Sequence, residues 1–136
     1  MKRCLCCYKQ LHAGEIDYHS HCIKKVFGSL IAPTAPVLPY TRKDINDLAQ
    51  VIVANSTTVT GVQSKLSIDL QQDNTGGPQR LTTVGLMGRY ILKPQTERFE
   101  RLPEIEDLSM HLAEIAKIPT VPHALIRFVD GELNYI

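Results

Sequence analysis

The architecture of this chain is organised around the stretch Asn55-Ser-Thr-Thr-Val-Thr-Gly-Val-Gln-Ser-Lys-Leu-Ser-Ile68, which ends in an alternating, strand-like pattern. Small hydroxyl residues and one glycine precede that strand, so we expect a loop that touches a ligand. Thr58 and Thr60 offer hydroxyl groups, and Gly61 leaves space for close approach. Lys65 places a cation at the exit of the loop, which makes phosphate the obvious ligand. The alternative is an ordinary loop that leads into a hairpin.

The composition predicts one compact domain, with room for at most a small additional module. The chain has 136 residues, of which 43% are hydrophobic, and its formal net charge is +1. A charge this close to neutral, without a local basic patch, excludes a general attraction to nucleic acid. No run reaches the ~18 apolar residues of a membrane span, and the N-terminus lacks the apolar core of a signal peptide. We therefore expect a soluble, cytoplasmic protein without direct contacts to nucleic acid or membranes.

All four cysteines lie in the first 22 residues, a placement that favours metal binding over disulfides in a reducing compartment. Cys4-x2-Cys7 and His19-x2-Cys22 have the spacing of zinc ligands. A two-residue gap lets both side chains of a pair reach one tetrahedral ion. Thiolates and a neutral imidazole suit Zn2+ and leave no open coordination position. We therefore predict a structural zinc site formed by Cys4, Cys7, His19 and Cys22.

Two neighbouring residues leave the ligand set open. Cys6 could replace either cysteine of the first pair, and His21 could replace His19. The alternative to a metal site is a set of buried free cysteines or of adventitious disulfides.

Proline and glycine divide the chain into three parts. A Cys/His module is predicted over 1–28, a proline-rich linker over 29–40, and a lobe of the α+β class, with an antiparallel sheet and two helices, over 41–136. Thr41 and Asp44 form a capping-box pattern at the start of the first helix.

Hydrophobic periodicity places the elements of this lobe. The two helices are expected over 42–54 and from Leu102-Pro103 onward. The residues expected to face the core are Ile45, Leu48, Ala49 and Ile52 in the first helix, and Ile105, Leu108, Leu112 and Ile115 in the second. Strands are expected over 65–70, 80–84, 89–94, 124–129 and 133–136, separated by turn residues.

Two charged residues of the lobe stand in unusual places. Lys93 ends an apolar strand, where it must either reach water or meet a carboxylate or phosphate. Glu106 lies beside the apolar stripe of the second helix, where it is either a solvated first-turn residue or a group that reaches inward. Taken singly, each residue favours its solvent-exposed alternative.

Together these segments resemble the N-terminal lobe of the HipA family, bacterial serine/threonine kinases that act as toxins in type II toxin–antitoxin systems. Thr58-Val-Thr-Gly-Val-Gln-Ser-Lys65 is similar to the family's phosphate loop, Ser-x-Ser/Ala-Gly-x-Gln-x-Lys, and Tyr90-Ile-Leu-Lys-Pro94 is similar to its ATP-lysine strand. Pro103-Glu-Ile-Glu106, followed by Met110-x-Leu-Ala113, is similar to the family's Asn-Glu helix start. The Cys/His module resembles a leader of some shorter members, so the resemblance covers most of the chain.

The resemblance implies an ATP site that works with Mg2+ in the full-length protein. Lys93 would bind the phosphates, and Glu106 would pair with Lys93. The loop that covers the phosphates would include Thr58, Thr60, Gly61, Gln63 and Lys65. Thr58 and Thr60 would be autophosphorylation positions. The implied partners are a C-terminal kinase lobe, a HipB-like DNA-binding antitoxin and a protein substrate, which by resemblance is an aminoacyl-tRNA synthetase.

This chain departs from the family pattern at three points. Thr58 and Thr60 stand where members carry serine at the first position and often at the third, and Ile105 stands where members carry asparagine. No catalytic-loop aspartate and no magnesium-binding motif follow Ile136. We therefore expect a truncated lobe that holds half of an active site.

Two other functions compete with the kinase lobe. One is a non-catalytic binding subunit that pairs with an antitoxin or with a separately encoded catalytic lobe. The other is a zinc-stabilised nucleic-acid binder, which the missing basic patch and the low aromatic content of 6% disfavour.

Overall fold

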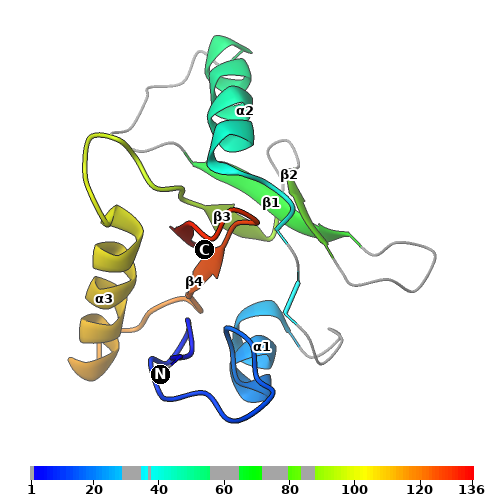
Figure 1. Ribbon diagram of the computed structural model, residues 1–136. Helices are drawn as coiled ribbons and strands as arrows, with labels where there is room; N and C mark the ends of the chain where they lie inside the picture. Colours follow the sequence, from blue (N-terminus) through cyan, green and yellow to red (C-terminus); the bar gives the residue numbers. More distant parts are fainter. Residues whose placement is uncertain (1, 29–34, 37, 56–64, 72–79, 84–87) are drawn as a thin grey trace.

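The computed structural model describes residues 2–28, 35–36, 38–55, 65–71, 80–83 and 88–136 (Figure 1). In these ranges the helices are α1 (Ser20–Phe27), α2 (Arg42–Asn55) and α3 (Leu102–Ile115). The strands are β1 (Leu66–Gln71), β2 (Arg80–Thr83), β3 (Tyr90–Leu92), β4 (Leu125–Arg127) and β5 (Leu133–Tyr135). Every helix within the described part is too short or too polar to cross a lipid bilayer. The predicted α+β class with antiparallel pairing is confirmed, but within the described residues the strands form two sheets in place of the single predicted sheet, and there are three helices in place of two.

The strands form two antiparallel sheets that meet at one bridge. β1 lies in the middle of the first sheet, whose order is β2-β1-β3, with Leu66 opposite Leu92. β4 and β5 form the second sheet. Between the sheets, the Lys93 N–H donates to the Tyr135 carbonyl at 2.8 Å, and the Tyr135 N–H donates back at 3.1 Å. Lys93 therefore lies where the two sheets join.

The alternating pattern of the strands produces the core of the lobe. Its apolar side chains that are at most 1% exposed include Ile45, Leu66, Ile68, Leu81, Leu92 and Ala124. Leu48 is partly buried against this core, whereas the side chains of Ala49 and Ile52 lie outside the described residues. At the start of α2, the Thr41 N–H donates to Asp44 Oδ2 at 2.8 Å, and the Asp44 N–H donates to Thr41 Oγ1 at 3.3 Å. The predicted capping box is therefore present.

The predicted core-facing side of α3 is wrong. The expected seam is largely exposed, with exposed fractions of 55%, 49%, 56% and 75% for Ile105, Leu108, Leu112 and Ile115. The buried positions of the helix are instead Pro103 and Asp107. Burial of a carboxylate is costly unless it has hydrogen-bond partners. Asp107 has two, because Tyr8 and His123 both bond to it.

The N-terminal segment packs against the second sheet and shares the buried core of the lobe (Figure 1). The Leu125 N–H donates to the Leu5 carbonyl at 2.9 Å, and the Tyr18 hydroxyl donates to the Leu125 carbonyl at 2.5 Å. α1, which was not predicted from the sequence, buries Phe27 against this region. In the predicted linker, 29–34 and 37 lie outside the described residues, so the division into three parts stays a prediction.

A glycine just before β3 leaves no room for a side chain. A Cβ atom at Gly88 would lie 2.5 Å from the Ile68 carbonyl oxygen and 2.6 Å from Ser67 Oγ. We expect Gly88→Ala to destabilise the fold by about 1–3 kcal/mol, because the clash includes backbone atoms that cannot rotate away. Chemical denaturation of the purified variant measures this change.

Gly28→Ala shows the effect of backbone strain without a clash, and it is itself expected to lower the free energy of unfolding by about 1 kcal/mol or more. Gly28 has open space around its Cα but a φ of +91°, so alanine there introduces only backbone strain. A Gly88→Ala variant as stable as the wild type would contradict the close approach of β3 to β1.

Candidate functional site

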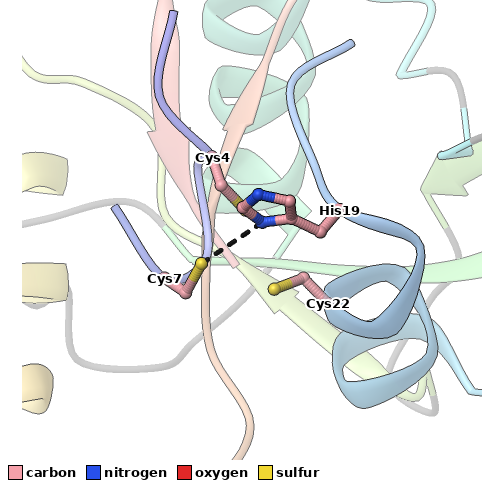
Figure 2. A group of neighbouring side chains, drawn as sticks. All are labelled: Cys4, Cys7, His19 and Cys22. Atoms are coloured by element: carbon pink, nitrogen blue, oxygen red, sulfur yellow. Dashed lines mark hydrogen bonds between the residues drawn. The ribbon is translucent and has the colours of Figure 1, made fainter. Parts of the chain in front are cut away.

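Four donor atoms converge in the N-terminal segment (Figure 2). They come from Cys4, Cys7, His19 and Cys22, and all lie within 4.8 Å of one another. Cys7 Sγ is 3.4 Å from His19 Nδ1. Ligands that share a tetrahedral zinc ion lie about 3.5–4 Å apart, given Zn–S and Zn–N bonds of about 2.3 and 2.0 Å. The cluster could therefore hold a metal such as zinc.

Local backbone structure positions the donors. Cys4 and Cys7 flank a tight turn in which the Tyr8 N–H donates to the Cys4 carbonyl at 3.0 Å. His19 is the N-cap residue of α1, which brings it close to Cys22 in the first turn. His19 Nε2 lies 3.0 Å from the Gln10 carbonyl oxygen. A proton on Nε2 is donated to that carbonyl, so the lone pair of Nδ1 faces the cluster.

The electrostatics of the cluster also suit a cation. Burial raises the pKa of the Cys4 thiol, but hydrogen bonds from backbone N–H groups, that of Cys6 first, outweigh it and lower the pKa to about 7. Burial and the neighbouring cysteines raise the pKa of Cys22. The bare sulfurs therefore cannot all become charged at neutral pH. A divalent ion would supply the missing positive charge and displace the remaining protons.

The two alternative ligands lie beside this cluster. Cys6 is 2% exposed, and burial raises the pKa of its thiol to about 11. His21 is exposed on α1, although its Nε2 lies 3.3 Å from Cys22 Sγ. Neither residue belongs to the group of mutually close donors described above. The geometry therefore favours Cys4, Cys7, His19 and Cys22 as the ligand set.

Lys93 and Glu106 form an ion pair between Nζ and Oε1. Lys93 directly follows β3, and Glu106 lies in the second turn of α3. Both side chains are 24% exposed, and Lys93 Nζ also lies 5.2 Å from the centre of the Tyr135 ring. The sequence left open whether Lys93 and Glu106 point to solvent or reach inward. In the structure both side chains reach inward and pair with each other.

Lys65 adds a second positive charge near this pair. The register that sets Leu66 opposite Leu92 places Lys65 next to Lys93 along the same ladder. Partial burial lowers the pKa of the Lys93 ammonium, and the positive charge of Lys65 lowers it further. The ammonium groups of Lys65 and Lys93 carry two positive charges, and the Glu106 carboxylate neutralises only one of them. The remaining positive charge favours an anionic ligand.

The other predicted phosphate-loop residues, Thr58, Thr60, Gly61 and Gln63, lie outside the described part of the chain. Their placement in a phosphate site stays a prediction.

A further polar group, missed in the sequence, joins the N-terminal segment to α3. The Tyr8 hydroxyl donates to Asp107 Oδ2, and His123 Nδ1 lies 2.7 Å from Asp107 Oδ1. Burial raises the pKa of Tyr8, and its bond to Asp107 raises it further, so Tyr8 remains a donor. Lys25 of α1 also donates to Glu114 of α3 at 3.1 Å. No local spacing connects these residues, because their contacts depend on tertiary packing.

Comparisons with known proteins add no relative: no family model matches this chain, and no curated protein matches it in sequence.

Proposed function

We propose that this chain is the N-terminal, ATP-binding lobe of a HipA-like serine/threonine protein kinase that acts as a toxin. The observation that supports this proposal is the ion pair between Lys93 and Glu106. Protein kinases use this combination, a lysine from a strand of the sheet and a glutamate from a neighbouring helix, and both residues must be in place for phosphoryl transfer. The antiparallel sheet and α3 supply that combination here.

In this proposal the residues of the chain bind and orient the nucleotide. Lys93 holds the α- and β-phosphates, Glu106 orients Lys93, and Lys65 adds positive charge at the same edge of the sheet. ATP with Mg2+ supplies the phosphoryl group that is transferred. The base and the magnesium-binding carboxylates belong to a C-terminal lobe, which also contributes to binding the protein substrate and a HipB-like antitoxin.

The loop from Thr58 to Lys65 would regulate this site as well as cover the phosphates. Phosphorylation of Thr58 or Thr60 would add a charge of about −2 to the loop. That charge would compete with the nucleotide for the two ammonium groups, so the modified kinase would bind ATP poorly.

A structural zinc ion completes the proposal. Cys4, Cys7, His19 and Cys22 would fill all four positions of a tetrahedral ion, which leaves none for a substrate. The ion would hold the N-terminal segment in the shape that contacts β4 and α3.

A non-catalytic binding subunit is the second candidate, and the exposed side of α3 favours it. Ile105, Leu112 and Ile115 are each more than half exposed on one helix. Large exposed apolar side chains that gather on one face often mark a protein interface.

We expect the isolated chain to bind ATP weakly and to transfer no phosphate. Its residues position phosphates, whereas much of the acceleration in phosphoryl transfer comes from metal ions and a positioned base. Incubation with radiolabelled ATP should label neither the chain nor an added protein, and a nucleotide titration should show weak binding that Lys93→Ala removes. Binding that is unchanged in Lys93→Ala would favour the non-catalytic subunit, and autophosphorylation by residues 1–136 would contradict the division of work between two lobes.

A further inference from the structure

Polar contacts hold α3 in place more than apolar packing does. The buried residues of this helix are Pro103 and Asp107. Its apolar residues Leu108, Leu112 and Ile115 are each 49% or more exposed, so they pack little against the rest of the chain. Hydrogen bonds weaken steeply when their geometry is distorted, and a helix that depends on them is held at one rotation about its own axis.

The carboxylate of Asp107 is the centre of these contacts, and each of its oxygens has its own partner. The Tyr8 hydroxyl donates to Oδ2, and His123 Nδ1 lies 2.7 Å from Oδ1. His111 Nε2 is 3.5 Å from Oδ2, which is too long for a good hydrogen bond. Because Asp107 is 0% exposed, loss of the Tyr8 hydroxyl would leave a charged oxygen buried without a donor, which is costly.

Tyr8 reaches α3 from the turn that carries the first two candidate metal ligands. It directly follows Cys7, and its N–H donates to the Cys4 carbonyl at 3.0 Å. Its φ of +59° is left-handed, a conformation that is uncommon for a residue with a side chain and that fixes the direction of the ring here. The ring also lies 4.7 Å from the His111 ring on α3. Tyr8 therefore connects this turn to the helix.

The rotation of α3 that satisfies Asp107 also places Glu106. Consecutive residues of an α-helix point in directions about 100° apart, since there are 3.6 residues per turn. Asp107 is directed toward Tyr8, and its neighbour Glu106 is directed toward Lys93. A rotation of the helix that carried Asp107 toward water would therefore carry Glu106 away from Lys93.

We infer that Tyr8 is a positioning residue that holds α3 at the rotation in which Glu106 meets Lys93. The inference rests on the proposed function, in which this ion pair orients ATP. Tyr8 acts on the nucleotide site through Asp107 and has no contact with the nucleotide. When the Tyr8 bond is lost, only a fraction of the molecules keeps a competent site, and the apparent affinity for ATP falls with that fraction.

Tyr8→Phe tests this inference, because it removes the hydroxyl and keeps the ring. Hydrogen exchange of the α3 amides, measured relative to exchange in β1, should become about 10-fold faster or more. The dissociation constant for ATP should rise about fivefold or more. In a Glu106→Gln background, Tyr8→Phe should not weaken ATP binding further. Circular dichroism and elemental analysis should show the same helix content and metal content as in the wild type.

The matched control is Tyr18→Phe. It removes the hydroxyl of another tyrosine of the N-terminal segment, one that donates to the Leu125 carbonyl of β4 and not to α3. This variant should keep the exchange ratio and the ATP affinity of the wild type. Equal exchange ratios in the two variants would overturn the inference, as would an effect of Tyr8→Phe on ATP affinity that persists in Glu106→Gln. If the wild type binds no ATP, the proposed ATP site is wrong, and the exchange ratio alone decides the role of Tyr8.

Discussion

Replacing Cys22 with serine is expected to abolish zinc binding at the N-terminal cluster and to lower the thermal midpoint by about 10 °C or more. Cys22 contributes one of four donors, and a short segment without a large core of its own depends on metal binding for its folding free energy. The effect should spread into the lobe, because Leu5 and Tyr18 of the same segment both bond to Leu125 of β4. Elemental analysis and a thermal melt measure the two changes.

Cys6→Ser provides the matched control for this experiment. Cys6 is also a buried cysteine, but it lies outside the donor cluster. Its substitution should leave the zinc content intact and change the midpoint by only a few degrees. A protein that is purified without metal and keeps its midpoint in a strong chelator would rule out a structural zinc ion. Zinc loss in Cys6→Ser but not in Cys22→Ser would show that the ligand set is wrong.

If this chain is the proposed kinase lobe, Lys93→Ala should lower the rate of phosphoryl transfer about 100-fold or more once the lobe is joined to its catalytic lobe. Removal of one preorganised group that stabilises charge in the transition state typically lowers the rate of the chemical step about 10²–10³-fold. Glu106→Gln should also reduce activity, because it removes the charge that pairs with Lys93 but keeps the size of the side chain. Kinase assays at saturating and at low ATP separate the loss of rate from the loss of nucleotide affinity.

Lys43→Ala is a suitable control, since Lys43 is an exposed lysine on α2. It should retain wild-type activity. If Lys93→Ala and Glu106→Gln were as active as this control, the assignment of both residues to an ATP site would be wrong. A folded but inactive Lys93→Ala protein, by contrast, is the outcome that the proposal requires.

Local patterns in the sequence were sufficient for most elements of the fold. The capping box of Thr41 and Asp44 depends on residues three apart, and the buried strand positions Leu66 and Ile68 follow from alternation. The orientation of α3 could not be obtained in this way. Its apolar residues do recur at helical spacing, but the buried position is Asp107, whose partners come from elsewhere in the chain.

The candidate sites also differ in how far local sequence patterns could predict them. The spacing of Cys4 and Cys7 is local, so the metal cluster could be predicted from residue types and gaps. The pairing of Lys93 with Glu106 spans a turn and a helix start, and it was expected only because the motifs resembled a kinase lobe. The contact of Asp107 with His123 had no signal in the sequence, because a buried polar pair is recognisable only once the packing is known.

The hydrogen bond from Tyr18 to Leu125 can form only late in the synthesis of the chain on the ribosome. Its two residues are 107 positions apart. At a synthesis rate of about 5–20 residues per second, the N-terminal cysteines wait about 5–20 s before β4 exists to cover them. During that interval the thiols are open to oxidation, which bound zinc would slow. If the cluster binds zinc, a nascent chain that captured the metal early would reach docking with its sulfurs protected.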